Sequence, residues 1–444
     1  MERVALTLIV CTVCLACSTG AVHPSAPADG VARVVPAGGT PGLKVADVPR
    51  SISARVATRV HEFGGAYIDG HGSLTVYLTD LSSEPSAKRA LTNELLASGR
   101  EAPGMRVRAA RYTYADLWRW KNALRPLLTS AGVAMLAVDE RANRVRVETS
   151  DNTVALATRW IQRLGVPLAA VEVVATARMV EAGSVDGGQR PAIGGLRIAG
   201  FFEQTGITYT IICSYGLNAR DFADTVHHYM VVASHCVQHS PPVGGYVGAN
   251  VYQPDTTALR ANLVGAVFAN PLFLSGGACP AGAYCRASDA ALVRIAPGVT
   301  ATLGAVARPL GRAFLPQIYG PTTIDPSQPT FQLAGYSEAL VGDTVDKVGG
   351  ATGWTGGVVT AVCADVNIGG YIRTCSGVVS GGAGLGDSGA PVMYKNARGR
   401  YYVEGMVFGL TDNGPDGVSG RQYYFSPWQS ISDDLAGFAG LGVR

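Results

Sequence analysis

The spacing of apolar residues changes twice along this chain. An apolar run over residues 4–16 is followed by a stretch, residues 22–49, that is rich in Pro, Ala and Gly and shows little periodicity. Helical and strand-like spacings then alternate over residues 50–178. From Ile193 onward, short apolar runs are separated by Gly, Pro, Asn and Asp. These patterns predict a leader, a flexible spacer, an α+β region and an all-β region.

The spacing of apolar residues divides the middle region, residues 50–178, into individual strands and helices. Alternating side chains predict two hairpins, one joining residues 66–69 to 74–77 and one joining 136–139 to 144–147. Helical spacing predicts helices near residues 86–98, 114–128 and 154–164, with a kink at Pro126. The predicted organisation is a signal peptide at 1–21, a spacer at 22–49, an α+β domain at 50–178, a linker at 179–192 and an all-β domain at 193–444.

Composition narrows the class of protein. Of the 444 residues only 16% are charged, and 56 are glycine, which fits a turn-rich globular protein and argues against disorder. The net charge is +3 and no run of Lys or Arg stands out. Neither nucleic acid nor an anionic membrane surface is therefore expected as a partner.

The nine cysteines fall into two groups. Cys11, Cys14 and Cys17 lie in the predicted leader, and Cys17 leaves lipid anchoring open as an alternative to plain secretion. The other six cysteines all lie after residue 200, and an even number in an exported chain indicates disulfides. Zinc is the weaker alternative, because these six contain no CxxC pair. Pairing sequence neighbours, one of several possible arrangements, gives Cys213–Cys236, Cys279–Cys285 and Cys363–Cys375.

Three short segments carry candidate chemistry. The first ends an apolar strand with Ser234-His235-Cys236, and the second places Asp289 before the apolar run at 290–293. The third is a glycine-rich turn, Gly386-Asp387-Ser388-Gly389. A serine hydroxyl needs a neighbouring base to act as a nucleophile, and an Asp can orient that base. The order His, Asp, Ser therefore predicts acyl transfer with His235, Asp289 and Ser388 as catalytic residues. The backbone N–H groups of Gly386 and Ser388 would bind the oxyanion.

These segments resemble the motifs Ala-His-Cys, Asp-x-Ala-Leu and Gly-Asp-Ser-Gly-Gly-Pro of the chymotrypsin-like serine protease family. Cys213-Ser214-Tyr215-Gly216, Ala192-Ile193-Gly194-Gly195 and the stretch 347–356 resemble its bacterial branch of alpha-lytic protease and the streptogrisins. The resemblance covers residues 190–444, and more weakly 50–178 as a pro-region. It implies two antiparallel six-stranded β-barrels with the catalytic residues at their junction, a Cys213–Cys236 disulfide and no cofactor.

The substrate pocket departs from the family pattern. The resemblance places Gly382 at the floor of the pocket and Phe408 and Gly409 near its wall. Phe408 takes the place of a family serine whose hydroxyl contacts the catalytic Asp, unless a shift by one residue puts its side chain on the pocket wall instead. Ser234 and Ala390 also replace family residues, but by side chains of similar size.

The sequence predicts a secreted serine endopeptidase, made as a precursor with an N-terminal pro-domain. Its partners would be protein or peptide substrates and that pro-domain, with a membrane involved only if Cys17 is lipidated. The alternative is an inactive protease-like module that binds peptides or a surface partner. An α/β-hydrolase esterase does not fit, because its catalytic order is Ser, acid, His. No metal site is expected.

Overall fold

The computed structural model describes residues 51–130, 133–149, 153–176, 179–180, 187–204, 206–221, 227–238, 248–411, 413–436 and 441–442. The predicted signal peptide and spacer, most of the predicted linker, and Cys11, Cys14 and Cys17 lie outside these residues. No helix among the described residues combines the length and the apolar character needed to cross a membrane.

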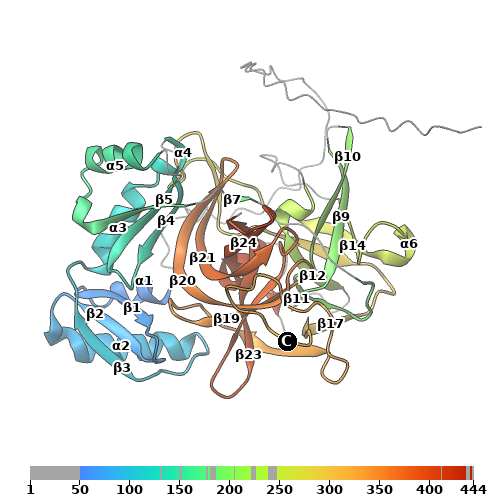
Figure 1. Ribbon diagram of the computed structural model, residues 1–444, viewed down its shortest axis with the longest axis horizontal. Coiled ribbons are helices and arrows are strands. Elements are labelled where there is room, and N and C mark those ends of the chain that lie inside the picture. Colours follow the sequence, from blue (N-terminus) through green and yellow to red (C-terminus); the bar gives the residue numbers. More distant parts are fainter. Residues whose placement is uncertain are drawn as a thin grey trace, which may run out of the picture. The chain divides into compact units, whose positions relative to one another are not determined.

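Residues 51–180, called the N-terminal part below, contain helices and strands in alternation (Figure 1). Both predicted hairpins are present, and the helix predicted over 114–128 is interrupted before Pro126, as a residue without an N–H group requires. The elements are α1 Ile52–Ala57, β1 Phe63–Ile68, β2 Leu74–Leu78, η1 Leu81–Ser83, α2 Glu84–Ala97, β3 Met105–Ala109, α3 Tyr114–Ala123, α4 Leu127–Ser130, β4 Val133–Asp139, β5 Arg144–Thr149, α5 Val154–Arg163, η3 Leu168–Ala170, β6 Val171–Ala175 and β7 Met179–Val180.

The rest of the chain is mostly β-sheet with a few helices. Short apolar strands separated by turns predominate, as the sequence predicted. The elements are β8 Ala192–Gly194, β9 Arg197–Gln204, β10 Ile207–Ser214, β11 Leu217–Asp221, β12 His228–Ala233, η4 Ser234–Cys236, β13 Asn250–Tyr252, α6 Leu259–Asn262, β14 Leu263–Ala269, β15 Tyr284–Arg286, β16 Ala290–Ile295, β17 Ala301–Ala307, β18 Thr330–Tyr336, β19 Thr344–Gly349, β20 Gly353–Ile368, β21 Tyr371–Gly384, β22 Pro391–Lys395, β23 Tyr401–Thr411, β24 Ser419–Pro427, α7 Trp428–Leu435 and β25 Leu441–Gly442.

Strand pairing divides this β-rich part into two sheets. One sheet has the order β10-β9-β13-β14-β16-β12-β11-β25. In the other, β19, β20, β21, β24, β23 and β22 pair in turn, each antiparallel to the next, and β22 pairs back to β19. These six strands form a closed ring, whereas no pairing among the described residues closes the first sheet. The pair of six-stranded barrels implied by the resemblance thus remains a prediction for the molecule as a whole.

The longest hairpin links the closed ring to the N-terminal part. Strands β20 and β21 have 16 and 14 residues, and the far end of β20 pairs with β4 through Asp365↔Leu136 and Val366↔Met135. Strands β5 and β6 continue this sheet. The N-terminal part therefore adds its strands to a sheet of the β-rich part.

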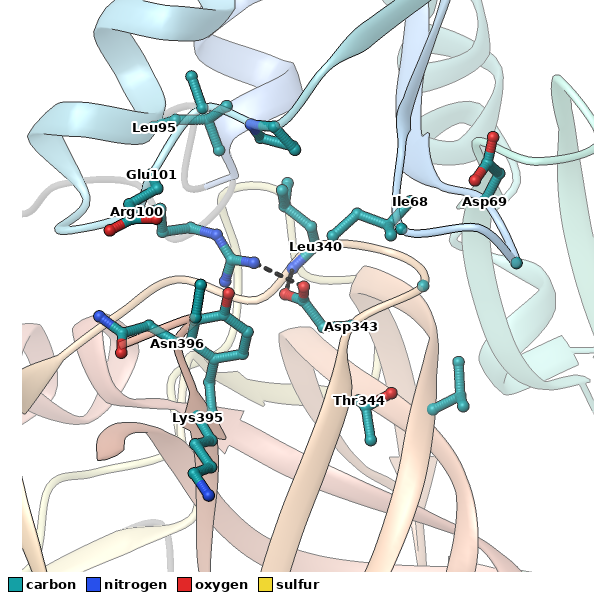
Figure 2. Close-up of a pocket in the computed structure, with 18 of the residues that line it drawn as sticks. Ile68, Asp69, Leu95, Arg100, Glu101, Leu340, Asp343, Thr344, Lys395 and Asn396 are labelled. Carbon is teal, nitrogen blue, oxygen red and sulfur yellow. Dashed lines mark hydrogen bonds and ion pairs between the residues drawn. The ribbon is translucent and has the colours of Figure 1, made fainter. Parts of the chain in front are cut away.

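Buried ion pairs accompany this sheet extension, with the cation always in the N-terminal part. Lys121 and Arg125 both pair with Asp365, at 3.2 and 2.6 Å. Arg100 pairs with Asp343 at 2.5 Å and with Glu404 at 3.2 Å. The pair of Arg100 and Asp343 lies in the wall of a cavity of about 740 Å³ between the N-terminal part and strands β19 and β22 (Figure 2).

Candidate active site

His235 and Asp289 are brought together by two neighbouring strands. Strand β12 ends at Ala233, β16 begins at Ala290, and these two residues are directly paired. His235 follows β12 in a 3-10 turn, and Asp289 immediately precedes β16. The Asp289 Oδ1 atom accepts a hydrogen bond from the backbone N–H of His235 at 3.1 Å and lies 3.3 Å from its Nδ1 atom. The carboxylate therefore holds the backbone of His235 by a hydrogen bond and lies next to its ring.

The other carboxylate oxygen of Asp289 contacts an arginine. Arg373, from β21, donates to Oδ2 through Nε at 2.9 Å and also through Nη2. Both side chains are almost completely buried, and the backbone N–H of Asp289 donates to Ser426 Oγ at 2.8 Å. Burial by itself would raise the pKa of the Asp289 carboxyl, but the charges of Arg373, His235 and Arg286 hold this pKa well below its usual range.

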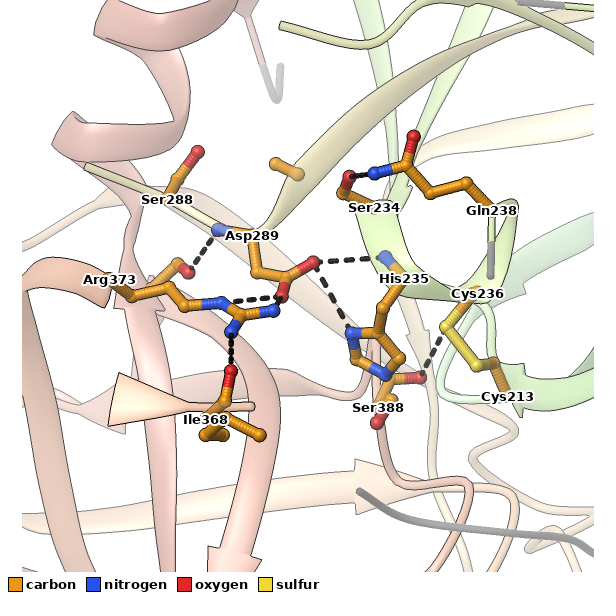
Figure 3. A network of polar contacts seen from close by, with 12 residues as sticks. Cys213, Ser234, His235, Cys236, Gln238, Ser288, Asp289, Ile368, Arg373 and Ser388 are labelled. Atoms are coloured by element: carbon orange, nitrogen blue, oxygen red, sulfur yellow. Dashed lines mark hydrogen bonds and ion pairs between the residues drawn. A yellow bond between two sulfur atoms is a disulfide. The ribbon is translucent and has the colours of Figure 1, made fainter. Parts of the chain in front are cut away.

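Ser388 lies in the turn between β21 and β22, and its backbone is held close to the His235 segment. Its carbonyl oxygen accepts a hydrogen bond from the N–H of Ser214 at 2.7 Å and lies 3.9 Å from the Sγ atom of Cys236. Figure 3 shows the imidazole of His235 between the Asp289 carboxylate and Ser388. The Ser388 hydroxyl is buried and has no hydrogen-bond partner among the described residues. The three predicted catalytic residues are thus gathered at one place.

The turn before Ser388 is built around a buried ion pair. Asp387 accepts from Lys347 Nζ and from Thr352 Oγ1, both at 2.6 Å, and from the N–H of Gly384 at 2.9 Å. Gly386 has a φ angle of +101°, a conformation that favours glycine. Among the described residues, neither the N–H group of Gly386 nor that of Ser388 donates to another backbone carbonyl, so neither is committed to an acceptor that an oxyanion would have to replace.

The predicted pocket residues lie on adjoining strands of the closed ring. Gly382 is on β21, where a Cβ atom would collide with the carbonyl oxygen of Ile318. Phe408 and Gly409 are on β23. The Phe408 side chain is fully buried in a cluster that includes Met135 of the N-terminal part, and Arg373 lies over its ring at 5.6 Å. The ring thus faces the Arg373 side of the site, while a role in the substrate pocket stays a prediction.

The six later cysteines form the pairs given by sequence neighbours, Cys213–Cys236, Cys279–Cys285 and Cys363–Cys375. Among the described residues, the one group of His, Cys and acidic side chains with metal-like proximity is Cys213, His235 and Cys236. Both of these cysteines are in a disulfide, so they offer no thiolate to a metal.

A segment of the N-terminal part lies along β23. Met179 and Val180 form the short strand β7, which pairs antiparallel with Thr411 and Leu410. These positions directly follow the predicted pocket residues Phe408 and Gly409. An extended chain therefore already occupies the edge of β23 beside the candidate site.

Comparison with solved structures identifies several similar proteins. Thermobifida fusca Protease A is 22% identical over 56% of this chain and 97% of its own, with a TM-score of 0.36. Nocardiopsis Protease is 21% identical over 57% of this chain and 98% of its own, with a TM-score of 0.35. Alpha-lytic protease homolog N4 is 19% identical over 57% and 98%, with a TM-score of 0.36.

The chain is similar to bacterial serine proteases of the kind that its motifs resemble. No protein-family model matches the chain, and neither does any curated protein. At such low sequence identity the likeness concerns the fold alone. Any statement about the chemistry of this chain has to come from its own residues.

Arg373, which binds the carboxylate of Asp289, is a residue of the site that sequence reasoning missed. It lies 84 positions from Asp289, in a strand whose pattern shows nothing unusual. The only signal was indirect, since Phe408 stands where a hydroxyl partner for the Asp was expected. A missing partner for a buried carboxylate indicates that another donor must reach it.

Proposed function

We propose that this protein is a secreted serine endopeptidase with His235, Asp289 and Ser388 as its catalytic triad. The observation that carries the proposal is the contact of Asp289 Oδ1 with His235 Nδ1, 3.3 Å away, while the backbone of Ser388 is held beside Cys236. The three disulfides support export, because such bonds persist in oxidising compartments.

The residues act in two chemical steps. In acylation, the Ser388 hydroxyl attacks the peptide carbonyl carbon while the Nε2 atom of His235 takes its proton. Asp289 keeps the proton of the ring on Nδ1 and stabilises the imidazolium. His235 then gives the proton to the leaving amine, and the acyl group stays on Ser388. In deacylation, His235 takes a proton from water, whose oxygen attacks the ester carbonyl carbon. His235 then gives that proton to the Ser388 oxygen as the bond to the acyl group breaks, which releases the acid and restores the Ser388 hydroxyl.

The negative charge on the carbonyl oxygen is met by two backbone N–H groups. Gly386 and Ser388 supply them, in a turn that Asp387 holds in place through Lys347 and Thr352. Donors fixed before the reaction cost no reorganisation when the charge develops. These steps need only the side chains and backbone of the chain itself.

The same proposal includes synthesis as a precursor, with residues 50–178 as a pro-domain that is removed near residues 179–192. The pairing of Met179 and Val180 with β23 supports this, because protein substrates commonly bind as an added strand along such an edge. A segment in that position reaches the candidate site in the way a substrate would. The rival proposal, an inactive peptide-binding module, takes its support from Phe408 in place of the family serine.

Covalent labelling distinguishes these two proposals. A fluorophosphonate should label the processed protein at Ser388, and Ser388→Ala should lose both the label and about 10⁶ in turnover. Asp289→Asn should lose about 10⁴ in turnover. Ser327, an exposed serine that donates to Asp325, provides the matched control Ser327→Ala, which should behave as wild type. A folded, processed wild-type protein that resists the label would favour the binding module.

A further inference from the structure

Asp289 has an unusual second partner for a carboxylate that must stabilise a histidine. Its Oδ2 atom is bound by two nitrogens of Arg373, whose side chain is 2% exposed. Arg373 comes from β21, a strand that carries neither His235 nor Ser388. The guanidinium is therefore brought to the site by a strand of the other sheet, and it meets the Asp289 carboxylate on the side away from His235 (Figure 3).

The surroundings of Arg373 hold its guanidinium in one position. It lies over the rings of Phe273 and Phe408, at 5.3 and 5.6 Å, and donates to the carbonyl oxygens of Tyr371 and Ile368 at 3.2 and 3.4 Å. A planar fork that stacks on aromatic faces binds a carboxylate with a defined geometry. Phe408, which supplies no hydroxyl, instead supplies one of the faces on which Arg373 rests.

A charged partner does more than a hydroxyl would. An Asp paired with a guanidinium has part of its negative charge compensated, so it attracts a protonated imidazole less strongly. Arg286 adds a second positive charge nearby, but it donates to the carbonyl oxygens of Ser288 and Ala290 and pairs with Asp434 at 3.7 Å. Among the described residues, Arg373 is thus the cation in direct contact with the carboxylate that faces His235.

We propose that Arg373 is a positioning residue that orients Asp289 and, through its charge, sets the pH range in which His235 acts as a base. This inference rests on the proposed protease function. Loss of the charge would let His235 hold its proton up to a higher pH, because Asp289 would then act on it alone. Replacing the planar guanidinium of Arg373 by another cation would disturb the orientation of the Asp289 carboxylate without changing the charge beside it.

Two substitutions separate charge from geometry. Arg373→Gln should move the acid limb of the kcat/KM profile upward by about one pH unit, at the low end of shifts caused by a charge within 4–6 Å. Arg373→Lys should leave that limb in place and lower kcat, with KM little changed. The matched control is Arg312→Gln, which removes the pair of Arg312 with Asp346. It should leave both the acid limb of the kcat/KM profile and kcat unchanged. An unchanged limb in Arg373→Gln, or equal shifts in both Arg373 variants, would overturn the proposal.

A second measurement compares two inactive chains. In the full chain carrying Ser388→Ala, the His235 imidazole can be titrated by NMR with and without Arg373→Gln. The midpoint should be about one pH unit higher when Arg373→Gln is present, and equal midpoints would contradict the role of Arg373. This titration does not depend on turnover. Wild type that resists fluorophosphonate would therefore refute the protease function, while the titration would still decide the effect of Arg373.

Discussion

At the level of single residues, the segment around Gly382 presents no carboxylate to a basic substrate side chain. Ala383 and Gly384 follow it, and the acidic residue closest to it in sequence, Asp387, is buried in an ion pair with Lys347. A pocket without a free carboxylate cannot compensate the desolvation of Arg or Lys.

We therefore expect cleavage after apolar or uncharged side chains. A peptide library digested with the processed protein and read by mass spectrometry would measure this preference, with the Ser388→Ala protein as the blank. Strong selection of Arg or Lys just before the cut would show that the pocket is formed by other residues.

Residues differ in how far the sequence could predict them. His235, Asp289 and Ser388 lie in short motifs whose residue types report their chemistry, and each of the six cysteines after residue 200 has a partner within 23 positions. Arg373 could not be found in this way, because its partner is distant in sequence and an arginine in a strand has many ordinary uses. Its role depends on a packing arrangement of β16, β21 and β23 that no local pattern encodes.

At the level of elements, the β20–β21 hairpin and α3 are joined by buried charges. Asp365 on β20 pairs with Lys121 and Arg125, and it also accepts from the N–H of Cys375 at 3.2 Å. Burial lowers the pKa of Lys121 to about 8 although the nearby Asp365 acts to raise it. Removing a buried partner leaves an uncompensated charge, which costs about 3–5 kcal/mol.

Asp365→Asn should therefore weaken the pairing of β4 with β20. Hydrogen exchange of residues 114–139 in the full chain would measure this, with faster exchange expected than in wild type. Lys121→Met, which keeps the pair of Arg125 with Asp365, should have a smaller effect. Asp325→Asn changes an exposed turn residue and serves as the control. Equal exchange in all variants would mean that these ion pairs do not stabilise the pairing of β4 with β20.

Glu140, at the end of β4, makes the stability of the N-terminal part depend on pH. It accepts from Ser53 Oγ at 2.6 Å and from the N–H of Ala66 at 2.7 Å, and it is 1% exposed. Burial raises the pKa of this carboxyl to about 7, in spite of these two hydrogen bonds. The folded chain thus keeps a proton that the unfolded chain releases near pH 4.5.

Since the unfolded state binds fewer protons in that window, the free energy of unfolding should fall as pH rises from about 4.5 to 7. The total loss is about 3 kcal/mol at 1.36 kcal/mol per pKa unit. Thermal unfolding of the full chain carrying Ser388→Ala, measured across this pH range, would show this loss of stability. Hydrogen exchange would show whether the loss lies in the N-terminal part. Glu140→Gln should remove this fall, whereas Glu84→Gln, on an exposed side chain paired with Lys88, should preserve it.

For the whole molecule, the arrangement of strands bears on how the chain folds. Element types could be predicted from periodicity, since the hairpins and helices of the N-terminal part and the strands after Ile193 follow local patterns. The pairing of β4 with β20 could not, because Leu136 and its partner Asp365 are 229 positions apart in the sequence (365 − 136). Such non-local contacts require loop closure before they contribute any stability, so they slow folding.

This topology motivates the prediction that residues 50–178 assist folding. The closed ring contains four antiparallel pairs of consecutive strands, and it is completed by two pairings between strands that are not consecutive, β21 with β24 and β19 with β22. A protease among proteases also depends on slow unfolding. A high barrier to unfolding in such a topology usually comes with a high barrier to folding. The N-terminal part pairs with the β20–β21 hairpin and places Lys121 on its Asp365. Arg100 also pairs with Asp343, next to β19, and with Glu404 on β23, so the N-terminal part can hold these strands near the hairpin before the ring closes.

Expression of residues 190–444 alone should therefore give little active protein, and addition of residues 22–189 as a separate chain should restore activity. The recovered activity should rise with the concentration of the added chain, because assistance requires association. Asp365→Asn in the 190–444 chain should raise the concentration needed, whereas Asp325→Asn should not. Rapid folding of residues 190–444 to full activity without help would refute the assistance. A mature secreted protein that still carries residues 50–178 would instead indicate a permanent N-terminal binding domain.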